Sequence, residues 1–494
     1  MKNKIKNKIA ALVMCAVVGI GTTFAETPFA GGTGTYNDPF LIETPTQLDN
    51  VRNHLDAHFA LTNDLDMTGI EFRPIGRNDE GTGFVVFTGS LDGREHIIYN
   101  LTIVDSATSV GLFSRIQIAA EDSGQIVIQN LGLVNVSIYN RMAVGAGTHT
   151  GAFVGSLVRG TMINIFADDA EIISTIGITG GIVALMQTSR LSLGWFNGSV
   201  IASGGTVGGL AGSIGRIAAA YPGSIIENSY VMGHVEGTQN VGGVAGMVSQ
   251  VSVVRNVWTS ATVRGTLTAT ATNVGGIASN TTVYSRIETS VSLAPSVRFG
   301  GLNVFRIANV SANSTLANNF ALSTTELWTS GGEGLADTLL PVARIGMDSV
   351  NGHSITMEQA QTQATFTTAP FAWDFENIWR MNQGGARLPI FIWQEGDEDN
   401  GEDNGDGPEP PPSSINPDLP TSIAVSVSPN PTFGEVSIEI ENAEIKQVLI
   451  FTMTGQQVFS TTQSEFNIEH LSRGIYVVHI VTDVGNFVSR IVRR

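Results

Sequence analysis

A short apolar phrase built around paired glycines returns along the central part of the chain, from Val110 to Val304. A typical copy is Val241-Gly-Gly-Val-Ala-Gly, and successive copies begin 25 to 40 residues apart. The first glycines of the copies are Gly111, Gly151, Gly180, Gly208, Gly242, Gly275 and Gly300. A recurrence of this length indicates repeated structural units that stack on their neighbours.

A second phrase precedes most copies of the first and alternates apolar with small polar residues. Its clearest copies begin at Ile226 (Ile-Glu-Asn-Ser-Tyr-Val) and Val254 (Val-Arg-Asn-Val-Trp-Thr), with weaker copies from Ile128 and Ile163. Such alternation, with glycine at the joints, predicts strands rather than helices. A unit this short cannot close its own core, so the pattern predicts an all-β parallel β-solenoid (β-helix) over residues 106–322. Whether one copy makes one turn stays open.

The segments on either side of the repeats are predicted to cap the solenoid. Residues 26–105 form its N-terminal entry, with a short helix after Thr44 that the apolar spacing of Leu48 and Val51 favours. Such a helix covers strand edges that would otherwise promote aggregation. Residues 323–393 lack the repeat but are rich in large aromatic residues, which predicts a C-terminal cap with an aromatic plug.

Charge and cysteine content indicate the compartment and exclude one class of partner. Residues 1–25 combine lysines, an apolar run and a small-residue cleavage site, which predicts a secretory signal peptide. Loss of its four lysines takes the net charge from −18 to −22, a balance that repels nucleic acid. The single cysteine, Cys15, lies in this segment, and the bulky Met14 beside it disfavours a lipoprotein signal. No segment is long and apolar enough to predict a transmembrane helix.

The composition changes abruptly after the C-terminal cap. Residues 394–420 are rich in acidic residues, glycine and proline and contain no lysine or arginine, which predicts an extended linker. Residues 421–494 then contain seven short alternating runs separated by turn signals. This spacing predicts a small immunoglobulin-like β-sandwich.

The repeat phrases resemble a known repeat. The Asn-Ser-Tyr sequence at Asn228, followed by the glycine phrase at Val241, is similar to the GLUG repeat of bacterial surface and secreted proteins. The flanking segments resemble the usual entry and exit of such arrays, so the similarity extends from about Gly31 to Trp393. It implies a solenoid but little about function, because the repeat occurs in adhesin-like proteins and beside some peptidases.

The C-terminal domain resembles the sorting domain of the type IX (Por) secretion system. The similarity rests on Ser428-Pro-Asn-Pro-Thr-Phe-Gly, Thr452-Met-Thr-Gly and Leu471-Ser-Arg-Gly-Ile-Tyr. The motif positions are Pro429, Asn430, Pro431, Gly434, Gly455, Gly474 and Tyr476. The resemblance implies export across both membranes by the type IX machinery, to the cell surface or the extracellular space.

Motifs for metal binding and catalysis are sparse in this chain. His54 and His58 are four residues apart on the predicted helix, but no third ligand stands near them, so we expect no metal site and no cofactor. The acidic residues between positions 200 and 320 are Glu227, Glu236 and Glu288. We expect no two of these at equivalent positions of the repeat, which argues against a catalytic groove there.

An enzyme would therefore need a site in the irregular flanks. Its carboxylates would have to converge from distant parts of the chain. The candidates are Asp64, Asp66, Asp374 and Glu376.

Large aromatic residues recur at the repeat distance. They are Phe166, Phe196, Tyr230 and Trp258, at steps of 30, 34 and 28 residues. This recurrence predicts a stacked column that either packs in the core or faces outward, where it could stack on sugar rings. Tyr230 and Trp258 are the candidate ligand-binding residues.

Three short sequences resemble the O-glycosylation sites of Bacteroidetes secreted proteins. They place candidate modifications on Ser106, Thr338 and Ser349, each preceded by an aspartate.

These features together predict an exported β-solenoid that is adhesin-like or binds a glycan or a host matrix protein. The sequence favours a non-enzymatic protein. The alternatives are a secreted hydrolase or polysaccharide lyase with a site in the flanks, and a passive structural protein of the surface.

Overall fold

A computed structural model gives the structure of most of the chain between residues 28 and 493. It describes residues 28–77, 85–142, 147–266, 273–299, 303–311, 313–329, 338–382, 387–394, 425–428, 432, 434–440, 444–452, 457–472, 474–482 and 486–493. The predicted signal peptide, most of the predicted linker, and the motif residues Pro429, Asn430, Pro431 and Gly455 lie outside these residues.

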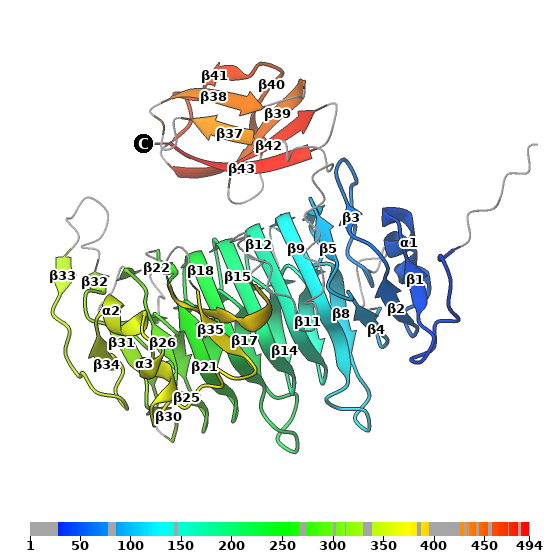
Figure 1. Cartoon of the computed structure of the whole chain (residues 1–494). Coiled ribbons are helices and arrows are strands. Elements are labelled where there is room, and N and C mark those ends of the chain that lie inside the picture. The colour runs from blue at the N-terminus through cyan, green and yellow to red at the C-terminus, as the bar shows by residue number, and fades with distance from the viewer. Residues whose placement is uncertain are drawn as a thin grey trace, which may run out of the picture.

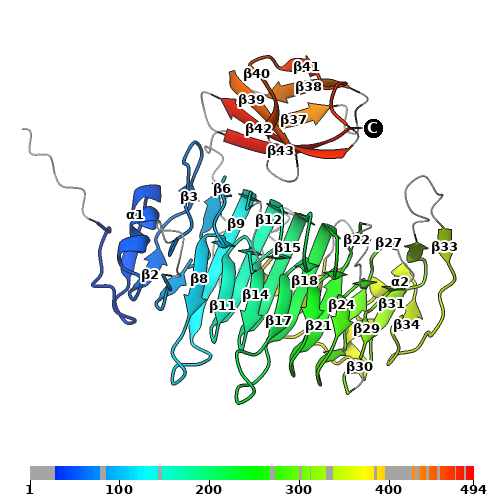
Figure 2. The ribbon, with the colours of Figure 1, turned by 180° about the vertical axis from the view of Figure 1, so that it is seen from behind.

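The main body is a stack of turns built from parallel strands, which confirms the predicted β-solenoid (Figure 1). Two of its faces are seven-stranded parallel sheets, one of which is well seen from behind (Figure 2). The first sheet contains β7 (Ser109–Val110), β10 (His149–Thr150), β13 (Ile178–Gly180), β16 (Val207–Gly208), β19 (Val241–Gly242), β23 (Val274–Gly275) and β28 (Val304–Phe305). The second contains β8 (Phe113–Gln117), β11 (Val154–Val158), β14 (Val183–Gln187), β17 (Ala211–Gly215), β20 (Ala245–Val248), β24 (Ala278–Thr281) and β29 (Asn309–Val310).

The third sheet has the most strands of the three. Its central strands are β9 (Ile126–Asn140), β12 (Thr161–Ser174), β15 (Arg190–Ala202), β18 (Ile225–Gly237), β21 (Val253–Thr259) and β22 (Thr262–Gly265). Toward the C-terminus it continues as β25 (Arg286–Glu288), β26 (Val291–Ser292), β27 (Ser296–Phe299), β30 (Thr315–Ala317), β31 (Phe320–Leu322) and β32 (Glu326–Thr329). Toward the N-terminus it includes β1 (Phe40–Ile42), β2 (His58–Leu61), β3 (Leu65–Asp66), β4 (Ser90–Asp92), β5 (Ile97–Tyr99) and β6 (Thr102–Asp105).

One copy of the glycine phrase makes one turn of the solenoid. Val207, Val241 and Val274 lie directly opposite one another in three successive turns. The paired glycines are required by the close approach of these turns, because a Cβ on Gly243 would lie 2.1 Å from the carbonyl oxygen of Gly276. The last strand of this stack is Val304–Phe305, and the copy predicted at Gly300 lies outside the described residues.

The interior is filled by apolar side chains from all three sheets. Leu210, Val244 and Ile277 occupy one position of three successive turns, and each is fully buried. Because identical positions repeat every turn, the same kind of side chain stacks along the axis and leaves one continuous core.

The N-terminal end is closed by the predicted helix. α1 (Pro45–Asn50) begins after Thr44, whose hydroxyl accepts a hydrogen bond from the backbone of Gln47 in a capping box. The chain continues as the short helix η1 (Val51–Asn53), and Leu48 and Val51 are fully buried against the first turns. The helix start predicted at Thr44 is confirmed.

The C-terminal segment differs from the predicted plug. After β33 (Thr338–Leu340) and β34 (His353–Ile355), the chain leaves the end of the solenoid and returns along its side (Figure 1). We call residues 357–394 the strap. It consists of α2 (Met357–Ala360), α3 (Ala364–Thr367), β35 (Trp379–Met381), β36 (Pro389–Phe391) and η2 (Ile392–Gln394). Its aromatic residues therefore cover an outer face of the long sheet instead of filling the open end.

A buried arginine occupies the end of the solenoid instead. The Arg306 side chain, which is 1% exposed, donates hydrogen bonds to the carbonyl oxygens of Asn351 and Leu322 and to the hydroxyl of Ser354, at 2.8, 3.1 and 3.0 Å. Burial lowers the pKa of Arg306 to about 10. These bonds tie the last turn to residues 351–354 and replace the strand that would come next.

The C-terminal domain has two small antiparallel sheets, in agreement with the predicted strands. One contains β37 (Val425–Ser428), β38 (Glu435–Ile440) and β41 (Glu465–Asn467). The other contains β39 (Ile445–Thr452), β40 (Gln457–Thr461), β42 (Gly474–Thr482) and β43 (Asn486–Arg493). Val436 and Ile438 of the first sheet share a core with Val448, Ile450 and Val478 of the second. Among the described residues no helix has the length and apolar character needed to cross a membrane.

The pH dependence of stability should show the effect of one histidine, His149 on β10. Burial and the neighbouring Arg115 lower its pKa to about 4. The unfolded chain then binds a proton that the folded chain does not, so stability falls as the pH drops from about 6.5 to about 4. We expect a loss of about 2–3 kcal/mol in the free energy of unfolding across this window.

Urea unfolding of the protein and of His149→Gln at pH 7 and pH 4.5 measures this contribution. The variant should lose less stability on acidification, because its side chain does not titrate. Equal losses in both proteins would show that His149 does not contribute.

Candidate ligand-binding groove

The predicted aromatic column exists, but one of its members differs. Phe166, Trp195, Tyr230 and Trp258 stack with ring centroids 4.7, 5.6 and 4.7 Å apart and planes within 4° of parallel. Phe196, predicted as a member, is fully buried in the interior. The strand register explains the difference, because Phe166 pairs with Trp195 and neighbouring residues of a strand face opposite sides.

The strap covers the two residues that the sequence proposed as ligand contacts. Trp258 donates its indole N–H to the carbonyl oxygen of Pro389 at 2.8 Å, and Gln394 donates to the hydroxyl of Tyr230 at 2.5 Å. Both aromatic side chains are 1% exposed, and burial raises the pKa of Tyr230. Tyr230 lies between the rings of Trp195 and Trp258, and Trp258 stacks on Tyr230 and is otherwise buried, so neither residue has a ring face open to a sugar. We assign the column to packing and propose no ligand role for Tyr230 or Trp258.

Truncation within this column should therefore destabilise the protein. Trp258→Ala removes a fully buried ring and a hydrogen bond, and we expect it to lower the free energy of unfolding by about 3–5 kcal/mol. Phe166→Ala, at the half-buried end of the column, is the matched control and should cost only about 1–2 kcal/mol. Denaturant unfolding checks both values, and equal small losses would contradict the packing role of Trp258.

A second column, of polar residues, runs beside the aromatic one. We call it the asparagine ladder; it takes one residue from each of seven successive turns, and all of them adopt left-handed backbone angles with φ between 45° and 56°. Its members are Asn130, Asn164, Leu193, Asn228, Asn256, Thr289 and Asn318. Asparagine predominates because its short polar side chain tolerates this conformation better than other residues with a Cβ.

Side-chain hydrogen bonds connect neighbouring members of the ladder. The amide of Asn256 donates to the side-chain oxygen of Asn228 at 3.2 Å, and the hydroxyl of Thr289 donates to the side-chain oxygen of Asn256 at 2.7 Å. These bonds fix the amide planes along the axis of the solenoid. The recurring asparagine of the second phrase, as at Asn228 and Asn256, is the sequence signal for this ladder.

The ladder forms one side of a groove of about 460 Å³ between the long sheet and the strap. The opposite side comes from the strap segment between α3 and β35, which includes Phe371, Asp374 and Ile378. The strap is anchored here by Trp373, which donates its indole N–H to the carbonyl oxygen of Thr289 at 3.1 Å. The remaining lining residues are Arg190, Glu227, Asn228, Arg255, Asn256, Glu288, Asn318 and Ala372.

A row of charged residues lies directly beside the ladder. Glu227, Arg255 and Glu288 pair across three successive turns, so Glu227 and Glu288 do occupy equivalent positions, contrary to the expectation from sequence. The turns differ in length, so residue spacing alone does not show this register.

Glu227 holds two guanidinium groups in place. Its side chain is 4% exposed and forms ion pairs with Arg190 and with Arg255, the latter at 2.6 Å, whereas the arginines are 48% and 40% exposed. A carboxylate that is buried between two half-exposed arginines fixes the direction in which their N–H groups point.

Removal of this carboxylate should destabilise the long sheet. Glu227→Gln leaves Arg190 and Arg255 adjacent without a counter-charge, and we expect a loss of about 1–2 kcal/mol in the free energy of unfolding, since both arginines are partly solvated. Glu288→Gln, whose side chain is 24% exposed, is the control and should change stability by less than about 0.5 kcal/mol. Similar values for the two variants in denaturant unfolding would argue against the role of Glu227.

The carboxylates proposed for an enzyme do not converge. Asp374 accepts hydrogen bonds from the side chain and backbone of Asn377 and from the backbone of Glu376, which lower its pKa and shape the strap segment. Asp64 and Asp66 belong to the N-terminal turns around β3, near the other end of the solenoid (Figure 1).

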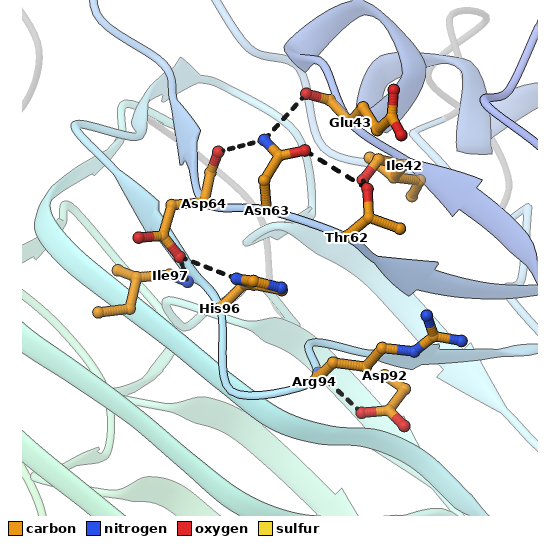
Figure 3. Close-up of polar contacts among 9 residues, drawn as sticks. All are labelled: Ile42, Glu43, Thr62, Asn63, Asp64, Asp92, Arg94, His96 and Ile97. Atoms are coloured by element: carbon orange, nitrogen blue, oxygen red, sulfur yellow. Dashed lines mark hydrogen bonds and ion pairs between the residues drawn. The ribbon is translucent and has the colours of Figure 1, made fainter. Parts of the chain in front are cut away.

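The surroundings of Asp64 form a local polar network (Figure 3). Its carboxylate accepts a hydrogen bond from the backbone N–H of Ile97 at 2.9 Å and lies 3.2 Å from Nδ1 of His96. Asn63, next to it, donates to the carbonyl oxygen of Glu43 at 3.1 Å (Figure 3). These bonds link successive turns.

Asp66 likewise has local partners. Burial alone would raise its pKa, but hydrogen bonds from Thr68 and Asn100 lower it overall. His58 hydrogen-bonds Ser90 at 2.8 Å, whereas His54 packs against Phe29 and Phe40. Within the described ranges no three His, Cys, Asp or Glu side chains lie close enough to hold a metal ion.

The remaining predicted positions lie on separate surfaces. Ser106 and Thr338 are exposed and Ser349 is half-buried. In the C-terminal domain Gly434 lies at φ 151°, where a side chain would be strained, and Gly474 begins β42. The Tyr476 hydroxyl donates to the carbonyl oxygen of Ser472 at 2.7 Å. Both glycosylation and the individual motif roles stay predictions.

Comparison with known families identifies the C-terminal domain. Residues 426–494 match the secretion system C-terminal sorting domain. This match confirms the predicted type IX sorting domain and indicates export to the cell surface or the extracellular space.

Two curated proteins are similar to parts of the chain. Halomucin of Haloquadratum walsbyi is 32% identical over 173 residues, which are 32% of this chain and 2% of that protein. A protein of Evansella cellulosilytica, described as a candidate Gly-rich membrane protein, is 35% identical over 137 residues, which are 26% of this chain and 14% of that protein. The chain thus spans only a small part of the length of these relatives.

A solved structure shares the fold of the solenoid. It is described as a candidate immunoglobulin A1 protease from Bacteroides ovatus, and it covers 74% of this chain and 96% of its own with a TM-score of 0.51 and 22% identity. At this identity the likeness shows the fold alone. The GLUG assignment stays a prediction.

Proposed function

We propose that this exported β-solenoid is a binding protein whose ligand is a neutral, hydroxyl-rich glycan held in the groove between the asparagine ladder and the strap. The observation that carries this proposal is the row of amide and guanidinium groups on successive turns, facing a strap segment with apolar residues. An amide offers a donor and an acceptor together, as does a sugar hydroxyl, so each asparagine of the ladder in the groove can exchange hydrogen bonds with a sugar.

The charge of the groove supports a neutral ligand. Arg190 and Arg255 are balanced by Glu227, Glu288 and Asp374, so the lining has no excess of positive charge to attract a polyanion. The chain as a whole carries a formal net charge of −18, which repels acidic polymers further. A polyanionic glycan is therefore disfavoured on electrostatic grounds.

The side chains that line the groove are also held in place by interactions within the protein. The ladder amides are hydrogen-bonded to one another, and Glu227 fixes the two arginines. Side chains that are already ordered lose little conformational entropy on binding, which favours affinity. Binding at this site needs no catalytic group, and the lining contains no histidine or cysteine.

Binding can be tested on a glycan and matrix-protein array with the purified full chain. We expect binding to neutral glycans, weakened about tenfold by Asn256→Gly, which keeps the left-handed backbone but removes the amide. Asn164→Gly is the matched control, because it changes the same ladder position outside the groove and should leave affinity unchanged.

Three outcomes would contradict the proposal. Binding of matrix proteins alone, binding that neither variant changes, or saturable cleavage of a substrate would each require a different function.

A further inference from the structure

The groove crosses several turns at one position of the repeat. Its lining takes the ladder residues Asn228, Asn256, Thr289 and Asn318 from four successive turns, and Arg190 from the turn before them, where the ladder residue is Leu193. The ladder residues among them pair directly across neighbouring strands, so the groove runs along the axis of the solenoid. A ligand that fills it must extend along this axis.

The spacing of equivalent contacts is set by the sheet. Neighbouring parallel strands lie about 4.8 Å apart, so these four ladder residues form a row of polar groups roughly 14 Å long. A ligand can present a hydrogen-bonding group to every turn only if its own units are spaced close to this distance. The repeat of the protein therefore selects the repeat of the ligand.

An extended peptide does not meet this condition. It advances about 3.3 Å per residue, and side chains on one face recur at about twice that distance, so its contacts lose register with the ladder. One sugar ring of an extended, β-1,4-linked pyranose chain advances by a length close to the roughly 4.8 Å rung spacing. Successive rings are turned over, but both edges of each ring carry hydroxyl groups, so a hydroxyl edge still faces the ladder at every turn. These hydroxyl edges can face the ladder while the ring faces approach Ala372 and Ile378 of the strap, which are more exposed than the buried Phe371.

We infer that the groove binds a linear, neutral, β-linked polysaccharide in an extended conformation, aligned with the solenoid axis and with about one sugar per turn. This inference rests on the proposed function and specifies its ligand class. Asn318 then contacts one end of the bound chain, and Asn256 contacts its middle.

The test measures affinity of the full chain for β-1,4-linked gluco-oligosaccharides of increasing length by titration calorimetry. We expect each added sugar to raise affinity by roughly threefold to tenfold until the chain spans the four ladder residues at about four sugars, after which affinity levels off. Coiled α-1,4-linked oligomers of equal length should bind at least about tenfold more weakly, because they cannot follow a straight row of contacts.

Two variants locate the ligand along the groove. Asn318→Gly should leave the affinity for short oligomers unchanged and make affinity level off about one sugar earlier. Asn256→Gly should weaken binding at every length beyond two or three sugars. Asn164→Gly, outside the groove, should give the profile of the unchanged protein.

The outcomes separate this inference from the proposed function. Glycan binding that is lost in Asn256→Gly but does not depend on oligomer length would overturn the inference and leave the proposed function standing. Equal affinity for α- and β-linked oligomers would also overturn it. Absence of binding to any neutral glycan on the array would overturn the proposed function, and the inference with it.

Discussion

The structure depends on the hydrogen bonds that join each turn of the solenoid to the next. They hold neighbouring backbones at one fixed spacing and in one register, so Val207, Val241 and Val274 lie opposite one another although the chain between them varies in length. Where the backbones approach most closely, only glycine fits, as the contact between Gly243 and Gly276 shows. Every position that repeats in sequence consequently becomes a straight column in space.

Two such columns on the outside of the long sheet have different roles. The aromatic column is stabilised by ring stacking and is then covered by the strap, which buries Tyr230 and Trp258. The asparagine ladder is stabilised by hydrogen bonds between side chains and remains partly accessible. By packing on the first column and leaving the second uncovered, the strap turns a flat sheet face into a groove.

Charge on this face is organised by the same register. Glu227 pairs with arginines on both neighbouring turns, of which Arg255 lies directly opposite it and Arg190 is offset by two residues along the adjacent strand. The resulting surface is polar, ordered and nearly balanced in charge. Such a surface suits recognition of hydroxyl groups better than recognition of a polyanion, and it fits a protein that a sorting domain directs to the exterior of the cell.

The sequence by itself determined the features that depend on local pattern. The recurring glycines specified stacked strands, Thr44 specified the helix start, and the motif around Gly474 and Tyr476 specified the sorting domain. The sequence also indicated an aromatic column. It pointed to Phe196 instead of Trp195, because the turns differ in length and the spacing of residues does not show the strand register.

Only the tertiary structure decided where the strap lies and hence which column is buried. The strap returns along the sheet over contacts between residues as distant in sequence as Trp258 and Pro389. The pairing of strands likewise brings Glu227 and Glu288 into one row and places Asn256 beside Asn228. Contacts of this kind are fixed by packing between distant segments, which no local pattern encodes.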